Sequence, residues 1–273
     1  MSASITTQGA LAERSLSAYD TATRLALPTA SAPDFSLTDA YEVAAAMRQS
    51  RIARGERPRG YKIGFTNRSI WTRYAVNGPI WGPVWDSTLT LIDGTHATVS
   101  LAGLVQPRLE PEIVFGFAQS PRAGMTEAEL AACLSWVAHG FEIVQSHYDD
   151  WRFQAPDTIV DGALHGRLIV GPRVPVSSFE ALGESLAALR LELFQGDMKI
   201  DEGVGSVVLD GPLTALRLWV DAMSVQPHGW PIAPGDVVTT GTLTDAWPLL
   251  PGQTWSTVLS DSRLAGLHLQ IGD

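Results

Sequence analysis

Two glutamates separated by one residue carry the strongest chemical signal in this sequence. Glu110 and Glu112 lie in the segment LVQPRLEPEIVFGF, whose apolar residues predict a β-strand. Because side chains alternate across a strand, both carboxylates point to the same face. Two neighbouring anions repel each other unless a cation lies between them, which favours a divalent metal ion. A solvent-facing pair of carboxylates is the alternative.

Pro111, between the two glutamates, limits where this strand can lie. Its nitrogen carries no hydrogen and cannot donate to a β-ladder. Proline within a sheet is therefore found on an edge strand or beside a bulge. We expect one of these two positions, with the glutamate side chains facing an open cavity.

A third carboxylate interrupts an apolar run. Glu142 stands between Phe141 and Ile143 in FEIVQSHYDDWRF, where a buried charge needs a partner. Three carboxylates, completed by water and substrate oxygens, suit the octahedral coordination of Mg²⁺ or Mn²⁺, whereas zinc prefers His and Cys. The alternative is an ion pair of Glu142 with an arginine such as Arg108 or Arg152.

A lysine lies in an equally apolar setting. Lys62, in GYKIGFT, stands between Tyr61 and Ile63. Burial would make its proton easier to lose, so that it could serve as a base or as an anchor for a carboxylate. A lysine that extends its ammonium group into solvent is the alternative.

Composition narrows the classes of partner. Lys plus Arg number 19 against 29 Asp plus Glu, a formal charge of -10, so nucleic acid is an unsuitable partner. The single cysteine, Cys133, excludes an intrachain disulfide and a cysteine-based zinc cluster. The N-terminal segment has no signal-peptide pattern, and no apolar run reaches the roughly 18 residues that would span a bilayer. We therefore expect a cytoplasmic protein without a membrane partner.

The chemical residues belong to a chain that is helical first and β-rich afterwards. Amphipathic spacing predicts a helix over residues 10–27, and Ser36 with Asp39 forms a capping-box pattern for a second helix that ends near Arg54. We interpret residues 1–273 as one catalytic domain, with a helical part (1–58) and a β-rich metal-binding part (59–273). Short apolar or alternating runs predict its strands: YKIGF, TLTLID, ATVSL, PEIVFGF, FEIVQ, RLIVG, LRLELF and DVVTTGTL.

Two further helices interrupt the β-rich part. The segment MTEAELAACLSWVAHG places Thr126 and Glu129 as a capping box, and GPLTALRLWVDAMSV places Pro212 at a helix start. The predicted class is thus α+β.

Several motifs in this order resemble those of a known family. They are GYKIGFT, GPIWGPVWDST, the Glu-Pro-Glu pair before an apolar strand, FEIVQSHYDDWRF followed by DTIVDGALHG, and VVTTGTLTDAWPLLPG. Together they resemble the 2-oxopent-4-enoate hydratase and 4-oxalocrotonate decarboxylase group of the fumarylacetoacetate hydrolase superfamily. The resemblance covers nearly the whole chain.

The resemblance implies a fold, a cofactor and a reaction. It implies a mixed β-barrel or roll with two N-terminal helices and inserted helices, and a homo-oligomer. Glu110, Glu112 and Glu142 match its metal ligands and Lys62 its active-site lysine, with Mg²⁺ or Mn²⁺ chelated by a small 2-oxo acid. The implied activity is hydration of 2-hydroxy-2,4-dienoates through a dienol, with the ion acting as a Lewis acid. The alternatives are decarboxylation, hydrolysis of acylpyruvates, and a non-catalytic metabolite-binding protein.

Two departures from the family pattern bear on the reaction. Related hydratases usually carry Pro-Asp-Phe-Gly where this chain has Pro79-Ile80-Trp81-Gly82, so the aspartate is replaced by Ile80. That change favours the decarboxylase. The other departure is His165, which lies where related hydratases carry serines and is a candidate catalytic acid or base or a structural histidine.

Three residues remain as candidates for substrate binding. Thr242 in the TTGT turn could receive the substrate carboxylate, Trp81 could line an apolar pocket for the unsaturated tail, and Asp161 begins the DGALHG motif. Ordinary turn and core roles are the alternatives for Thr242 and Trp81.

Overall fold

The computed structural model describes residues 5–227 and 229–272. The capping box at Ser36 begins α3 (Leu37–Ala53) as the sequence predicts: the Ser36 hydroxyl accepts from the backbone N–H of Asp39, and the Asp39 carboxylate accepts from that of Ser36. The first helix, α1 (Ile5–Thr21), ends earlier than predicted because Ala22 adopts a left-handed conformation with φ 51°. The segment before α3 also contains a short helix, α2 (Pro28–Ser31).

Two sheets form the body. Among the described residues, nine strands form the larger, mixed sheet: β2 (Ile80–Trp85), β1 (Pro58–Gly64), β11 (Val237–Thr242), β5 (Arg108–Phe117), β6 (Leu134–Val144), β7 (His165–Val170) and β3 (Leu89–Leu91) in spatial order, with β12 (Trp247–Pro248) beside β5 and β8 (Val174–Pro175) beside β6. The smaller sheet follows the order β10 (Met198–Val204), β9 (Arg190–Gln195), β13 (Thr254–Leu259), β14 (His268–Gly272) and β4 (His96–Ser100).

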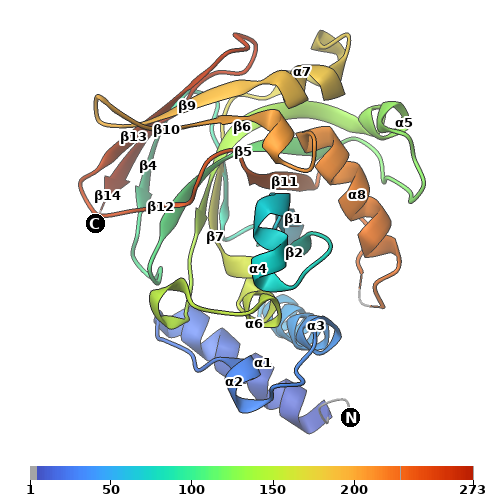
Figure 1. Ribbon diagram of the computed structural model, residues 1–273, viewed down its shortest axis with the longest axis vertical. Coiled ribbons are helices and arrows are strands. Elements are labelled where there is room, and N and C mark those ends of the chain that lie inside the picture. The colour runs from blue at the N-terminus through green and yellow to red at the C-terminus, as the bar shows by residue number, and fades with distance from the viewer. Residues whose placement is uncertain (1–4, 228, 273) are drawn as a thin grey trace.

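The remaining helices are inserted between strands: α4 (Trp71–Tyr74), α5 (Glu127–Ala131), α6 (Ala155–Val160), α7 (Leu182–Ala188) and α8 (Pro212–Ser224). Helix α8 begins at Pro212, as predicted, and buries Leu216, Trp219 and Val220 along one face. These side chains join the main hydrophobic core, which also contains Val238 of the larger sheet and Trp255 of the smaller one. One core therefore holds both sheets and α8 together (Figure 1).

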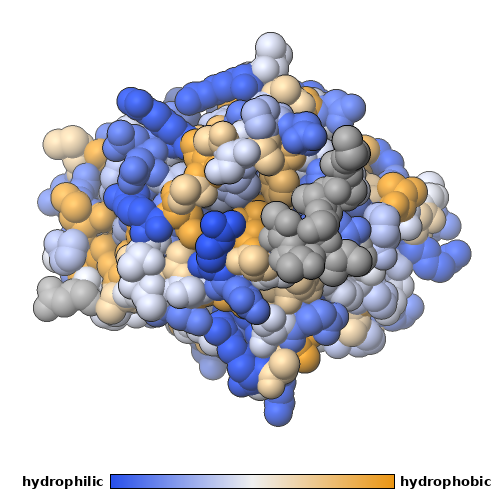
Figure 2. All heavy atoms as spheres, turned by 90° about the horizontal axis from the view of Figure 1, so that it is seen from below, coloured by the Kyte–Doolittle hydropathy of each residue, from blue (hydrophilic) through white to orange (hydrophobic). Residues whose placement is uncertain are grey.

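The helical first part packs against the β-rich part. Figure 1 shows α1, α2 and α3 together below the sheets, next to α6. A second hydrophobic cluster joins Val43 and Met47 of α3 to Ile159 of α6 and Ile80 of β2. Figure 2 views the molecule from this end, where hydrophobic residues lie scattered among hydrophilic ones outside the grey atoms. The N-terminal helices thus contact β2, the strand that follows the Lys62 segment.

One predicted helix is wrong over most of its length. The capping box of Thr126 with Glu129 is present, but α5 spans only Glu127–Ala131, and LSWVAHG belongs to strand β6. Strand β6 pairs with β5 and β7 along its two edges, and its consecutive side chains from Val137 onward are buried, so both of its faces are covered and its sequence is apolar without alternation. Such a run carries no period that separates a strand from a helix.

No helix in the described part of the chain is both long enough and apolar enough to cross a membrane.

Candidate active site

Strand pairing brings the three predicted carboxylates together. Strands β5 and β6 are antiparallel, and their register places Glu110 directly opposite Glu142, with Glu112 two residues further along β5. One ligand oxygen of each glutamate lies within 4.8 Å of those of the other two. Glu112 and Glu142 are fully buried. Directly opposed like charges destabilise a sheet, so this arrangement requires a compensating cation.

A bulge orients the carboxylate of Glu112. The register between β5 and β11 shifts between Thr239 and Thr242, on the side of β5 to which the Pro111 carbonyl points. Strand β5 is thus an inner strand of the sheet and not an edge strand. Pro111 lies beside the bulge, which is one of the two positions that the sequence predicts for it. The bulge directs the Gly241 N–H to Oε2 of Glu112 at 2.8 Å, and the Thr239 hydroxyl donates to the same oxygen. The other oxygen, Oε1, is buried without a hydrogen-bond partner among the described residues.

Gly241 is required at this bulge for two reasons. Its φ is +106°, a region that L side chains rarely adopt, and a Cβ there would lie 1.9 Å from Oγ1 of Thr66. We therefore expect Gly241→Ala to lower the free energy of unfolding by roughly 1–3 kcal/mol, measured by urea denaturation with chelator present. Gly235→Ala is the matched control, because Gly235 has φ +90° but nothing within 4 Å of its Cβ position. Equal losses in the two variants would contradict the role of the close approach to Thr66.

Glu142 has two cationic or hydrogen-bonding partners. Lys62 Nζ lies 3.1 Å from Oε2, and His165 Nδ1 lies 2.7 Å from Oε1. In the part of the chain that the structure describes, no ion pair joins Glu142 to Arg108 or Arg152. Glu142 is thus paired with Lys62 and hydrogen-bonded to His165, and it also belongs to the carboxylate cluster.

The buried charges shift one another's pKa values. Burial together with the neighbouring carboxylates raises the pKa of Glu110 to about 7 and that of Glu112 well above its usual value. Burial also opposes the charge of Glu142, but Lys62 and His165 outweigh it and lower the pKa of Glu142. The pKa of Lys62 is raised, because the three carboxylates outweigh burial. The expectation that burial makes Lys62 easier to deprotonate is therefore wrong for the metal-free protein.

The residues present fit a hard divalent cation. All three ligand groups are carboxylates, the donors that Mg²⁺, Mn²⁺ and Ca²⁺ prefer. Glu112 Oε1, buried and unpartnered, is the kind of atom that a metal ion would satisfy. One ammonium group, that of Lys62, does not neutralise three carboxylates.

A cavity of about 450 Å³ opens onto the cluster. Lys62, Glu110 and Glu112 line its wall, and two arginines, Arg73 and Arg108, bring positive charge to it. Aromatic side chains also line it: Phe65, Tyr74, Trp151 and Phe153. The cavity can therefore hold a small anion with an unsaturated tail beside the carboxylates.

Sequence reasoning did not assign Arg108 to the cavity. It stands two residues before Glu110 on β5, so the alternation that pairs Glu110 with Glu112 also places Arg108 on their face. Its guanidinium lies over the Trp151 ring, 4.3 Å from the centroid. Strand alternation therefore could have assigned Arg108 to the cavity from the sequence. Arg73 lies on α4, and no such alternation relates it to the glutamates.

Comparison with known proteins identifies the family. The chain is 32% identical over 256 residues to a 2-hydroxyhexa-2,4-dienoate hydratase from Comamonas testosteroni, a match that covers 93% of each protein. It is 30% identical over 218 residues to a 4-oxalocrotonate decarboxylase from a Pseudomonas species, with 80% of each protein covered. The chain belongs to this hydratase and decarboxylase family. Its members in these comparisons are lyases, and the protein is an enzyme of that class. No protein-family profile matches the chain.

The fold agrees with this family. A 4-oxalocrotonate decarboxylase from Pseudomonas putida G7, solved in complex with magnesium and adipate, superimposes with a TM-score of 0.90 over 99% of each chain at 23% identity. The architecture is the fumarylacetoacetate hydrolase-like α+β fold that the sequence predicts.

In this member of the hydratase and decarboxylase family, only one of the three candidate substrate-binding residues lines the cavity. Thr242 lines the cavity, and its hydroxyl donates to the Thr244 carbonyl at 3.0 Å. Trp81 does not line it, because its ring packs against Tyr41 with centroids 4.8 Å apart. Asp161 also lies elsewhere: its buried carboxylate accepts from the backbone N–H of His147 at 2.9 Å. The structure therefore gives neither Trp81 nor Asp161 a place at the cavity.

His165, the candidate acid or base, lies behind Glu142. It is 2% exposed, and it is absent from the described residues that line the cavity. It faces instead a small cavity of about 30 Å³ beside Tyr19, Arg51 and Trp85. Its burial outweighs the adjacent Glu142 and lowers its pKa.

Proposed function

We propose that the protein is a Mg²⁺- or Mn²⁺-dependent hydratase that adds water to 2-hydroxy-2,4-dienoates to give 4-hydroxy-2-oxo acids. The observation that carries this proposal is the buried cluster of Glu110, Glu112 and Glu142, which opens beside Lys62 onto a cavity large enough for a small acid. The relative of 32% identity, whose name describes a hydratase of such a dienoate, supports the substrate class.

The side chains of the cavity divide the work. Glu110, Glu112 and Glu142 would hold the cation, which supplies Lewis-acid polarisation of the 2-oxo group when bound. Lys62 holds a proton at Nζ on the cavity wall and can deliver it to, or take it from, the carbon chain of the substrate. Arg73 and Arg108 attract the substrate carboxylate, and the aromatic residues offer apolar contacts to its unsaturated tail.

The test is turnover of 2-hydroxypenta-2,4-dienoate, followed by loss of its ultraviolet absorbance with Mg²⁺, with Mn²⁺ and with chelator. We expect turnover with either metal, its loss in chelator, and 4-hydroxy-2-oxopentanoate as product. Turnover that survives exhaustive chelation would contradict the metal dependence. Release of pyruvate and a second acid from an acylpyruvate, without dienoate turnover, would indicate the hydrolase instead.

A second candidate, decarboxylation of a 4-oxalocrotonate-type 2-oxo acid, is favoured by Ile80. Its side chain lines the cavity near Lys62. A Cβ atom placed on Gly64 would lie 3.5 Å from Ile80 Cγ1 and 3.7 Å from Lys62 Nζ, so both side chains border the same point. The family resemblance places an aspartate of the hydratases here, so this chain presents an apolar wall where they present a carboxylate. Carbon dioxide release from 2-oxohex-3-enedioate, faster than dienoate hydration, would assign this activity. The homo-oligomeric state and the cytoplasmic location stay predictions.

A further inference from the structure

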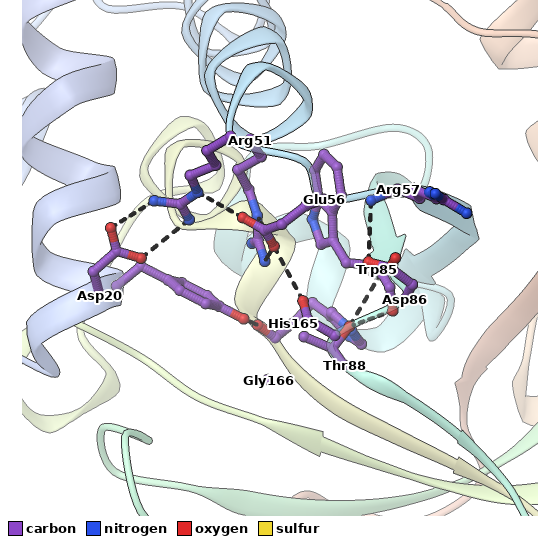
Figure 3. Close-up of polar contacts among 12 residues, drawn as sticks. Asp20, Arg51, Glu56, Arg57, Trp85, Asp86, Thr88, His165 and Gly166 are labelled. Carbon is purple, nitrogen blue, oxygen red and sulfur yellow. Dashed lines mark hydrogen bonds and ion pairs between the residues drawn. The ribbon is translucent and has the colours of Figure 1, made fainter.

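A chain of three side chains extends from the carboxylate cluster away from the cavity. His165 Nδ1 lies 2.7 Å from Glu142 Oε1, and the opposite ring nitrogen, Nε2, lies 2.8 Å from the Thr88 hydroxyl. All three residues are at most 3% exposed. Figure 3 shows His165 and Thr88 side by side, with Trp85 next to them. The chain Thr88–His165–Glu142 thus joins β7 and the start of β3 to the cluster.

Hydrogen-bond chemistry gives this chain a direction. An ionised carboxylate only accepts, so His165 Nδ1 must donate to Glu142. In the neutral ring Nε2 then accepts. The single hydrogen of the Thr88 hydroxyl can reach Nε2 at 2.8 Å or the Trp85 carbonyl at 3.2 Å, and the shorter distance favours donation to Nε2. The backbone N–H of Trp85 donates to the same hydroxyl oxygen at 3.1 Å, which fixes the position of Thr88. The proton order is therefore Thr88 to His165 to Glu142.

The N-terminal helices hold His165 from the far side. The hydroxyl of Tyr19 on α1 donates to the His165 carbonyl at 3.3 Å. The Arg51 guanidinium on α3 lies between the rings of Tyr19 and Trp85, 4.8 and 4.4 Å from their centroids. Arg51 Nε also donates to Glu56 at 2.9 Å. The N-terminal helices therefore fix the backbone at His165, and the hydrogen bonds of its two ring nitrogens fix the ring.

We propose that Thr88 and His165 are positioning residues that fix the carboxylate of Glu142 for metal binding, and that His165 does not exchange protons with the substrate. The proposal rests on the metal site of the proposed function. It differs from a catalytic role because His165 is absent from the described residues that line the cavity and reaches the carboxylate cluster through Glu142. Residues that hydrogen-bond a metal ligand without contacting the metal hold that ligand in the orientation that binds the ion.

Mn²⁺ affinity measured by electron paramagnetic resonance, without substrate, tests the proposal in two matched pairs. His165→Leu removes the donor to Glu142, whereas the amide nitrogen of His165→Asn can replace Nδ1. We expect about 10- to 100-fold weaker Mn²⁺ binding for His165→Leu and recovery of most of it by His165→Asn. Thr88→Val, which keeps the shape but removes the hydroxyl, should weaken binding several-fold, and Thr88→Ser should match the wild type.

A second readout addresses the proton order directly. Nitrogen NMR of ¹⁵N-histidine-labelled protein should show the Nδ1–H tautomer for His165, and Thr88→Val should change the Nε2 shift while Thr88→Ser leaves it near that of the wild type. If His165→Leu fails to fold, as judged by circular dichroism, the Thr88 pair carries the test. Wild-type Mn²⁺ affinity in folded His165→Leu or in Thr88→Val would overturn the proposal alone. Absence of Mn²⁺ binding by the wild type would overturn the metal site and this proposal together.

Discussion

Glu112→Gln is expected to abolish metal-dependent turnover and, in chelator, to raise the free energy of unfolding. The two effects have one cause. Glu112 is fully buried beside Glu110 and Glu142, and repulsion among these carboxylates destabilises the metal-free protein. An amide cannot ionise, so it takes no part in this repulsion at any pH, yet its oxygen can still accept from the Gly241 N–H. The same change removes a ligand, so turnover should fall by at least about 100-fold, the upper range for loss of an outer partner.

Three measurements establish this result. They are turnover with saturating Mg²⁺, Mn²⁺ affinity, and urea unfolding in chelator. Glu13→Gln is the control, because Glu13 is an exposed glutamate on α1 and should change none of the three. A Glu112→Gln variant that kept metal-dependent turnover would show that the ion binds elsewhere. A variant less stable than the wild type in chelator would show that repulsion among the carboxylates is not the dominant effect.

The metal-free wild type should also lose stability as the pH rises. The pKa of Glu110 is raised to about 7 and that of Glu112 well above the usual carboxyl value. Between the unfolded pKa near 4.5 and these folded values, the native state binds more protons than the unfolded state, so the free energy of unfolding falls as pH increases. The slope should be smaller in Glu112→Gln. Saturating Mg²⁺ should oppose the fall, since the ion binds deprotonated carboxylates.

The sequence predicted those parts of the site that depend on neighbours along the chain. The alternation of a strand places Glu110 and Glu112 on one face, and the structure confirms this arrangement. The capping box of Ser36 with Asp39 is equally local, and α3 begins there. Glu142 was recognised because a charge within an apolar run needs a partner, although that argument could not choose between a metal and an arginine.

Features that depend on distant segments were not predictable in this way. The residues Leu134–Val144 become a strand because they pair with both β5 and β7, and their apolar sequence carries no period. The direction of the Lys62 pKa shift depends on carboxylates from two other strands, whereas local sequence suggests only burial. His165 was proposed as an acid or base, but strand register places it behind Glu142.

Lys62→Met is expected to lower both the free energy of unfolding and the turnover. The loss of stability, unlike the loss of turnover, should depend on whether the metal ion is bound. Lys62 is 4% exposed, and its ammonium lies 3.1 Å from Glu142 Oε2. Removing one partner of a buried ion pair leaves an uncompensated charge, so the free energy of unfolding in chelator should fall by about 3–5 kcal/mol. Saturating Mg²⁺ should restore part of this loss, because the ion compensates the same carboxylates. Turnover should stay about 10²–10⁴-fold below the wild type, since methionine carries no proton to transfer.

Lys199→Met is the control that shows whether the effect of Lys62→Met comes from the burial of the lysine or only from its pairing with glutamates. Lys199 also binds two glutamates, Glu192 and Glu202, each at 2.6 Å, but its side chain is 40% exposed. Water screens such a pair, so this variant should unfold like the wild type and keep its turnover. If Mg²⁺ restored both stability and turnover to Lys62→Met, the lysine would serve only as a counter-ion for the carboxylates. If it restored stability alone, proton transfer would be the part of its role that a metal ion cannot replace.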